Sequence, residues 1–540
     1  MKNVILTGAS VMALAFSTGA VAQASADTLS SGIATCDNTS AGNCADTEQT
    51  GTGETAEVDQ SGATGSSISD IDQAGTGNTA DVEQVSEAGA SNESKIVQAA
   101  GASGNTANLT QSGAGNLSLI EQSGVDSNAS VVQAGVGNSS IVDQTFATDT
   151  DTVNVGQAGS QNSSEVNQLG YGATVNVTQT NNTVGSLGNN SLVNQAGLGA
   201  EVGVMQTGET NASVVNQAGA DALVTVDQNG IGNTSDVSQL AAAAIVDVDQ
   251  TGEGNQANVV QAGAGALVSI RQGQTDGSSD GNEATVQQLG AAAIVSVDQD
   301  GSQNAATVGQ AGVGSIVSVD QDGTTNVASV VELADLSDAT VTQQGDSNTA
   351  SVSQDWARAQ YGSFFGYPLT TSLVVENDTA TIDQNGSSNE ASISQFGRNQ
   401  SASIEQIGSG NSAGMAGGLP GIVQIGEDQA ATVSQVGNGN SSLVEQGSGQ
   451  TRTVYFGASS GNIANVSQTG DDGTSTIFQD GFDNTAMLEQ GGLSNESSIM
   501  QAGSGNYAHV TQASDSNGSM INQDGTNNSA TVVQGTAPSS

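Results

Sequence analysis

The chain has 540 residues, of which 72 are glycine and only 3 are proline, and its formal net charge is −49 because it carries 55 acidic and 6 basic residues. Nucleic-acid binding and adsorption to anionic lipids both need clustered Lys and Arg, so this composition argues against both kinds of partner. Low charge density, scarce proline and frequent Val, Ile and Thr also differ from a disordered chain and are typical of strands in a repeat array.

Residues 1–26 are typical of a secretory signal peptide. Lys2 supplies the positive start, Val4 to Phe16 form a short and mostly apolar run, and Ala22-Gln23-Ala24 and Ala24-Ser25-Ala26 are small-residue cleavage sites. The apolar run is too short for a spanning helix, and no other segment approaches one. The sequence therefore predicts export and no membrane span.

Residues 27–49 are irregular and contain the two cysteines, Cys36 and Cys44. In an oxidising compartment the pair can close one small loop, which we predict as a structural disulfide. Free thiols and pairing between chains are the alternatives, and the spacing fits no metal or redox motif. The segment is either a secretion-targeting tail or an N-terminal cap.

A glutamine recurs through 50–354 and again through 378–535, every eleven residues within runs that interruptions separate. An eleven-residue period also occurs in right-handed coiled coils, but most units contain Gly with Asn or Ser, which weaken a helix at every repeat. The sequence therefore predicts an all-β protein. The clearest run of this glutamine is Gln195, Gln206, Gln217, Gln228, Gln239, Gln250, Gln261 and Gln272.

The unit from Gln250 to Gln261 is a complete copy. Gly252, Gly254 and Asn255 suit a tight turn with left-handed backbone angles. Side chains of the following strand alternate between two faces. One face therefore carries Asn255, Ala257, Val259 and Gln261.

When the inward residues of successive eleven-residue units are compared, the full repeat is 22 residues long. Polar sets that begin with Asn211, Asn233 and Asn255 alternate with apolar sets that begin with Ala222 and Ala244. This pattern predicts a β-solenoid of strand–turn–strand–turn coils, each made of two eleven-residue units, with two parallel stacks and about 19–20 coils spaced by roughly 4.8 Å.

In such a rod each inward glutamine lies over the glutamine 22 residues away. A stacked amide donates to the next and accepts from the previous one, so a buried polar ladder stays satisfied. We predict such a ladder for the glutamines named above and for Asn211, Asn233 and Asn255. Glu332 occupies one glutamine position, so the phase survives a substitution there.

Two segments break the repeat. Residues 355–377 gather Trp356, Tyr361, Phe364, Phe365 and Tyr367 and are either a partner contact or an elongated turn. Residues 409–421 are Gly-rich and are expected to be a flexible loop. Residues 536–540 form a tail.

No catalytic, cofactor or metal site is predicted. Asp298-Gln299-Asp300-Gly301 looks like the start of a calcium loop but lacks the Glu that an EF-hand needs at its twelfth position. His509 is the single His, so metal and triad chemistry lack parts. Among 55 acids no carboxylate pair stands out. We expect the protein not to be an enzyme.

The units resemble the curlin repeat, Ser-x5-Gln-x-Gly-x-Gly-Asn-x-Ala-x3-Gln. Asn105 to Gln122 is close to this pattern, and Gln250 to Gln261 matches its second half. The resemblance implies a subunit of the extracellular amyloid fibres of a bacterial biofilm matrix, which reaches the cell surface through the periplasm and a curli-type outer-membrane secretion pore and works with a nucleator. This chain has many more repeats than a typical curlin, which leaves major subunit, minor subunit and nucleator open.

A solenoid adhesin that does not polymerise is the main alternative. An ice-binding solenoid would show rows of Thr-x-Thr, and the outward positions here are mixed. Gln523 and Gln534 lie in units of standard pattern with no cap visible after them, which favours stacking between chains.

The acidic residues that precede the glutamines face outward and are expected to stack. Asp227 and Asp249 repel each other, and Arg271 relieves the repulsion. Acid and divalent cations are therefore expected to speed assembly.

Overall fold

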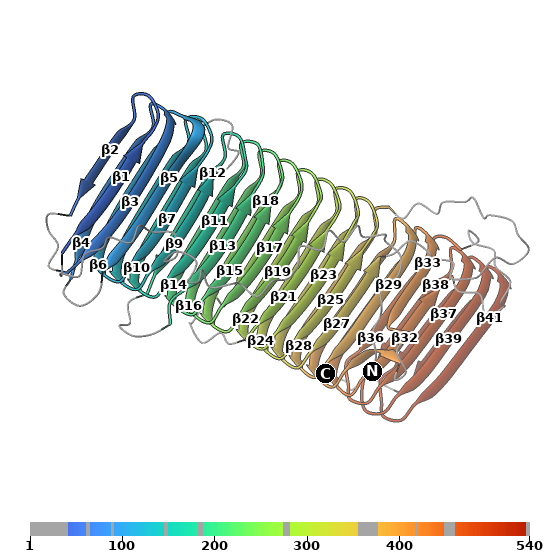
Figure 1. The fold of residues 1–540 in the computed structure, drawn as a ribbon. Helices are drawn as coiled ribbons and strands as arrows, with labels where there is room; N and C mark the ends of the chain where they lie inside the picture. Colours follow the sequence, from blue (N-terminus) through green and yellow to red (C-terminus); the bar gives the residue numbers. More distant parts are fainter. Residues whose placement is uncertain are drawn as a thin grey trace, which may run out of the picture.

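The computed structural model describes residues 42–60, 65–87, 91–144, 150–181, 187–273, 281–354, 376–415, 419–447 and 459–535. Their regular secondary structure is entirely β. The strands form a straight rod of stacked coils, with the N-terminal and C-terminal strands at opposite ends (Figure 1). The predicted all-β solenoid with a 22-residue coil is confirmed.

Each coil contributes one strand to each of two parallel sheets. The first sheet contains β1 (Cys44–Gln49), β3 (Ser67–Thr76), β5 (Asn92–Ser103), β7 (Leu117–Gln122), β9 (Ser139–Gln144), β11 (Ser163–Gln168), β13 (Asn190–Gln195), β15 (Ala212–Gln217), β17 (Thr234–Gln239), β19 (Gln256–Gln261), β21 (Glu283–Gln288), β23 (Ala305–Gln310), β25 (Val327–Glu332), β27 (Thr349–Gln354), β29 (Glu390–Arg398), β31 (Ser412–Met415), β33 (Ile422–Glu427), β35 (Ser441–Gln446), β37 (Thr474–Phe482), β39 (Glu496–Ser504) and β41 (Gly518–Thr526).

The second sheet contains β2 (Thr55–Asp59), β4 (Thr79–Ser86), β6 (Thr106–Ala114), β8 (Asn128–Val136), β10 (Thr152–Ser160), β12 (Thr174–Thr180), β14 (Glu201–Glu209), β16 (Leu223–Ile231), β18 (Ile245–Glu253), β20 (Leu267–Gln272), β22 (Ile294–Ser302), β24 (Ile316–Thr324), β26 (Asp338–Asp346), β28 (Thr379–Ser387), β30 (Ser401–Ser409), β34 (Ala430–Asn438), β36 (Ile463–Gln468), β38 (Thr485–Gln490), β40 (Tyr507–Gln512) and β42 (Ser529–Gln534). At roughly 4.8 Å per coil, the 20 strands of this sheet give a rod about 95 Å long.

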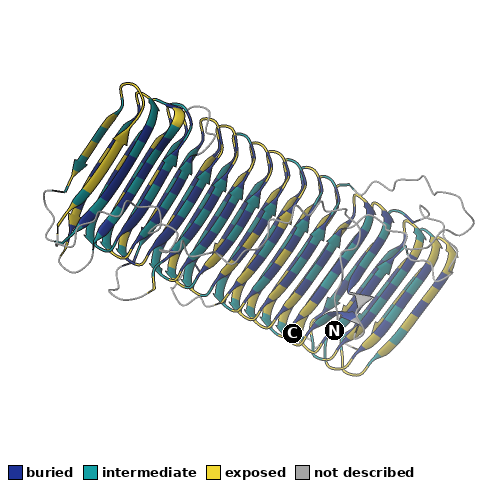
Figure 2. Cartoon of the chain, in the orientation of Figure 1, coloured by how far each residue is buried: buried dark blue, intermediate teal, exposed yellow. Residues whose placement is uncertain are grey.

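In most strands the side chains alternate between the space enclosed by the two sheets and solvent. In β18, Val246, Val248 and Gln250 are buried, whereas Ile245 is exposed and Asp247 lies half-buried on the outer face. The same alternation produces the banded pattern along most strands in Figure 2. The enclosed Val, Ala and Ile side chains form one continuous core from Ile71 to Ile521.

The glutamine ladder continues across residues 355–375. The glutamines of β26 and β28, Gln343 and Gln384, are 41 residues apart, yet they form the same 2.8 Å side-chain hydrogen bond as neighbours separated by 22 residues. Residues 355–375, which include the predicted aromatic contact, lie outside the described residues, as do the predicted signal peptide and Cys36.

Two expectations from the sequence need revision. Residues 44–49, assigned to the irregular segment 27–49, form β1 and pair with β3, because Gln49 precedes Gln60 by one eleven-residue unit. Residues 409–421, expected to be a flexible loop, contain β31 and the short β32 (Leu419–Pro420). β31 and β32 form a small antiparallel pair that interrupts one layer, and Ile422 then resumes the parallel pairing with Ile393.

Among the described residues no helix is long and apolar enough to cross a membrane.

Candidate self-assembly interface

The inward glutamines form two hydrogen-bonded ladders, continuous in the second sheet and interrupted at Glu332 in the first. All eight glutamines named from the sequence are at most 2% exposed. In the second sheet Gln228 Nε2 donates to Gln250 Oε1 and Gln250 Nε2 donates to Gln272 Oε1, both at 2.8 Å. In the first sheet Gln217 donates to Gln239 at 2.9 Å. The second amide hydrogen bonds a backbone carbonyl, as from Gln250 to Thr234 at 3.0 Å. Each described amide in these central coils is therefore fully satisfied, and every rung donates toward the C-terminal end.

The asparagines form a third ladder at the turns that enter the first sheet. Asn211, Asn233 and Asn255 are fully buried. The backbone N–H of Asn255 donates to Asn233 Oδ1 at 3.0 Å, and Asn233 Nδ2 donates to the Gly252 carbonyl of the next coil at 3.1 Å. Glycines stack beside this ladder so closely that a Cβ on Gly230 would lie 2.0 Å from Gly252 O. These turns therefore require both the amide and the glycine of the repeat.

Acidic residues replace the amide at a few buried positions. Glu332 lies between Gln310 and Gln354 in the first-sheet ladder and is fully buried. Neither of its carboxyl oxygens has a hydrogen-bond partner of ordinary geometry. Burial raises the pKa of Glu332 to about 8, and Ser315 and Gln310 offset this only in part.

Asp378, which the sequence did not single out, occupies the turn position before β28, where the neighbouring coils carry Ser337 and Gln400. Its Oδ1 accepts the backbone N–H of Gln400 at 2.8 Å, but its Oδ2 is buried without a partner. Burial raises the pKa of Asp378 to about 7. Aligning the coils before and after residues 355–375 in the sequence could have identified this buried position, because Asp378 then falls between Ser337 and Gln400, its neighbours in the stack.

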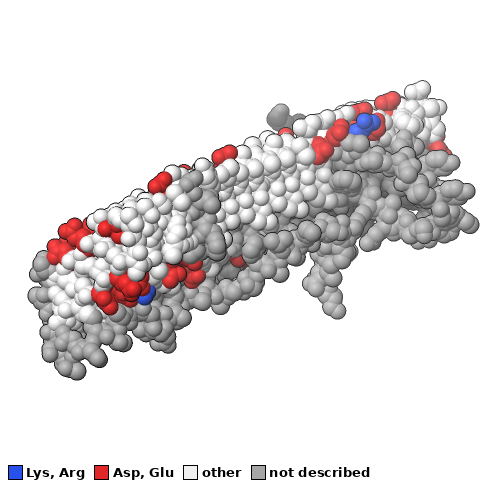
Figure 3. Space-filling model, turned by 45° about the horizontal axis from the view of Figure 1, so that its top comes forward, with Lys and Arg blue, Asp and Glu red and all other residues white. Residues whose placement is uncertain are grey.

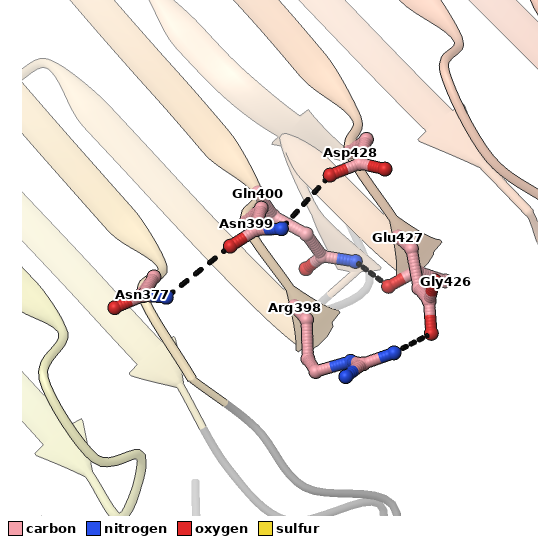
Figure 4. A network of polar contacts seen from close by, with 7 residues as sticks. All are labelled: Asn377, Arg398, Asn399, Gln400, Gly426, Glu427 and Asp428. Atoms are coloured by element: carbon pink, nitrogen blue, oxygen red, sulfur yellow. Dashed lines mark hydrogen bonds and ion pairs between the residues drawn. The ribbon is translucent and has the colours of Figure 1, made fainter.

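Polar side chains on the outside tie together the coils that follow this insertion. Asn377 Nδ2 donates to Asn399 Oδ1 at 3.3 Å, and Asn399 Nδ2 donates to Asp428 Oδ1 at 2.9 Å (Figure 4). Gln400 Nε2 reaches the Gly426 carbonyl at 3.0 Å. The stacking thus extends from the interior to the surface of the turn.

On the face seen in Figure 3, acidic side chains form separate groups on a largely uncharged surface, with few cations among them. Lys95 Nζ lies 2.9 Å from Asp70 and 3.3 Å from Asp72. Arg271 stacks between Asp249 and Asp298 in the second sheet. Within the described ranges no group of three or more His, Cys, Asp or Glu residues is arranged to hold a metal ion. Cys44 is disulfide-bonded, while Cys36 lies outside the described residues, so their pairing stays a prediction.

The first described coil presents hydrogen-bond acceptors at its outer edge. Gln49 and Gln60 donate to Gln73 and Gln84 of the next coil at 2.6 and 2.8 Å. Because every rung donates in the same direction, the Oε1 atoms of Gln49 and Gln60 accept no hydrogen bond from any described residue. Val58 of this coil is only partly buried, unlike its counterparts inside the rod.

The last described coil presents donors. Gln523 and Gln534 accept from Gln501 and Gln512 at 2.8 Å. Each donates one amide hydrogen to a backbone carbonyl. The other amide hydrogen has no rung to donate to within the described chain. Val532, on the inward face of this coil, is only partly buried.

The two edges also share one residue pattern. Ser529–Gln534 and Thr55–Gln60 both place Ala, Val and Gln at the inward positions: Ala530, Val532 and Gln534 in the last coil, and Ala56, Val58 and Gln60 in the first. One edge thus offers donors and the other offers acceptors, in matching register. A coil of a second copy would fit on either edge as the next coil does inside the rod.

Comparison with known families agrees with the repeat. The model of the curlin associated repeat matches residues 103–135, 294–323, 376–415 and 481–513, so the matches are spread along the rod. No curated protein matches the chain.

Proposed function

The chain belongs to the curlin-repeat family, and we propose that it is a secreted structural subunit of curli-like extracellular amyloid fibres that support biofilm matrix, surface adhesion and cell aggregation. The observation that carries the proposal is the complementarity of the two edges. The last coil offers Gln523 and Gln534 as donors, and the first offers Gln49 and Gln60 as acceptors.

Head-to-tail stacking would continue all the ladders across the junction between copies. It would also cover the half-exposed inward residues at both edges and pair the open backbone groups of the terminal strands, which otherwise template association. Growth of this kind needs no new conformation, because the added coil repeats the geometry found throughout the rod. Transport through a curli-type secretion pore and help from a nucleator complete the proposal.

A pair of adjacent substitutions in β42 tests the junction. Val532 faces the interior of the last coil and Val533 faces solvent, where it is 67% exposed. Val532→Lys buries a charge at the junction, whereas Val533→Lys adds the same charge outside it. The expected result is that Val532→Lys slows elongation at least tenfold and Val533→Lys does not.

Elongation would be followed by thioflavin fluorescence and electron microscopy of the purified mature chain, with circular dichroism to verify that both variants remain β-folded. Fibre diffraction should show the strand spacing of roughly 4.8 Å along the fibre axis. Equal elongation of both variants would refute this junction. A wild-type chain that stays monomeric at high concentration would refute the fibre and leave the solenoid adhesin that does not polymerise as the alternative.

A further inference from the structure

The outer face of the second sheet carries an uninterrupted row of aliphatic side chains. Parallel pairing places one such residue at the start of each strand from β16 to β24, each directly over the last: Leu223, Ile245, Leu267, Ile294 and Ile316. We call these five residues the aliphatic row. Glu201 occupies the same position in β14 and Asp338 in β26. An acidic residue therefore closes the row at each end.

The aliphatic row is open to solvent. Ile245, Ile294 and Ile316 are 42%, 39% and 43% exposed. The turns beside the row expose small uncharged residues such as Ala243 and Ala292, with Asp221 at the first rung as the charged exception, so a flat neighbour can approach closely along most of the row. On a chain with net charge −49, an uncharged aliphatic strip of this length is an exception to the surface around it.

An acidic row runs parallel to the aliphatic row on the same face. It contains Asp227, Asp249, Asp298 and Asp320, with Arg271 in the middle. It lies four residues further along each strand, which is about 13 Å at 3.3 Å per residue. Charges are screened over about 8 Å at physiological ionic strength. A contact confined to the aliphatic row therefore keeps the acidic row outside screening distance of the seam. Asp247, two residues from Ile245 on the same face, lies closer, at about 7 Å, as do Glu201 and Asp338 one rung beyond the ends.

We propose that the aliphatic row packs against the same row of a second copy, with the two rods side by side and parallel. The proposal rests on the proposed function in one respect: a fibre repeats the row once per subunit and so strengthens the contact. The row fits its own copy because both share one rung spacing, so branched side chains interdigitate along its whole length as in paired sheets of stacked strands. A two-fold axis along the row places the two acidic rows on opposite sides of the seam.

The contact area of the aliphatic row determines whether single rods or only fibres pair. Five rungs of roughly 4.8 Å and a width of about 10 Å give an area on the order of 250 Å² per copy, well below the roughly 800 Å² per partner of a stable complex. Isolated rods therefore pair only weakly. In a fibre the row recurs once per subunit, and the linked contacts act together. Fibres are expected to associate laterally in pairs whereas monomers do not.

The test compares Ile245→Lys/Ile294→Lys with Ile463→Lys. Ile463 has the same position in β36 and is 41% exposed, but its stacked neighbours are Ala430 and Thr485, so it belongs to no aliphatic run. The readouts are fibre width by electron microscopy and elongation rate by thioflavin fluorescence. The expected result is that wild-type and Ile463→Lys fibres are mostly paired, while the double variant forms single fibres at an unchanged rate.

Double-variant fibres that remain paired would overturn the inference while leaving the fibre function intact. If the wild-type chain formed no fibres, the proposed function would fail, and the row would be tested on concentrated monomer by sedimentation equilibrium. There the double variant is expected to lose weak self-association that the wild type and Ile463→Lys retain. Identical association of all three chains would overturn the inference.

Discussion

Gln354 Oε1 is buried without a hydrogen-bond partner directly beyond Glu332 in the first-sheet ladder. Everywhere else along this part of the ladder the preceding glutamine supplies an amide hydrogen to that oxygen, and an ionised carboxylate has none to supply. A protonated Glu332 restores the rung, because its hydroxyl can donate to Gln354 while its carbonyl oxygen accepts from Gln310. The rod therefore holds a proton where the repeat normally holds an amide.

Glu332→Gln is expected to stabilise the rod at pH 8–9. The carboxyl of Glu332 has a pKa of about 8 in the rod against 4.5 in its ordinary state. The unfolded chain thus releases this proton first as pH rises, so the rod loses stability between about pH 4.5 and pH 8 and no more above that. The substitution should remove this loss, which is on the order of 5 kcal/mol at about 1.4 kcal/mol per pKa unit.

Urea unfolding of monomer from pH 4 to pH 9 checks this expectation, with Glu390→Gln as the control because Glu390 is exposed on β29. A pH dependence that is the same in wild type and Glu332→Gln would contradict it.

The acidic row is expected to make assembly faster at pH 4 than at pH 8. Burial raises the pKa of Asp227, Asp298 and Asp320, and stacked aspartates raise that of Asp320 further. Raised pKa values mean that protonation, and with it the relief of like-charge repulsion, begins at a higher pH than for free aspartate. Stability that depends on these protons is lost as pH rises through the folded pKa values. Calcium should act in the same direction by screening the row.

The measurement is the thioflavin lag time at the two pH values, with and without calcium. Asp298→Asn/Asp320→Asn should shorten the lag at pH 8 and weaken its pH dependence. The control Glu253→Gln/Glu283→Gln removes the same charge from exposed sites on separate sheets. Equal lag times at both pH values would argue against electrostatic control by the row.

Gln250→Leu is expected to destabilise the middle of the rod although leucine is apolar and of similar size. The change leaves the Gln228 amide hydrogen and Gln272 Oε1 without partners, and each unpaired buried group costs about 1–3 kcal/mol. Hydrogen exchange of the amides in β16 to β20 reports the effect locally. Gln256→Leu, on the exposed side of β19, should leave protection unchanged. Similar losses in both variants would show that the ladder contributes little.

Gly230→Ala is expected to be far more damaging than Gly232→Ala. A Cβ on Gly230 would lie 2.0 Å from Gly252 O, whereas for Gly232 the nearest atom is Thr210 Oγ1 at 3.7 Å. Gly232 has φ 68°, and alanines occupy similar angles in the opposite turns, as at Ala243 with φ 53°. Gly232→Ala should therefore cost about 1–2 kcal/mol, and Gly230→Ala clearly more. Thermal unfolding of the two monomers provides the comparison.

Much of the fold follows from the sequence because a solenoid repeats one local rule. Alternation places Gln250 inside and Asp249 outside, and the 22-residue period sets which residues stack, as Gln228 under Gln250. The same reasoning locates the asparagine turn at Asn255. These are local properties of one coil, so they need no knowledge of distant contacts.

What the sequence did not show depends on register across insertions and on burial. The outward positions looked mixed, yet pairing across residues 355–375 puts Thr340 beside Thr381, and Thr381 beside Ser403, in one hydroxyl row. The aliphatic row and the acidic position of Asp378 emerge in the same way. The protonation of Glu332 depends on how completely the core excludes water, and the spacing of residues in the sequence does not give that information.

The 41-residue step between Gln343 and Gln384 has a consequence for how such a chain can change. The hydrogen bond between stacked glutamines forms whatever the number of residues between them in the chain. Additional sequence can therefore be inserted between two coils without changing the residues of the neighbouring coils. Length can be gained by duplicating coils and new surface chemistry by enlarging turns, and the two kinds of change proceed independently.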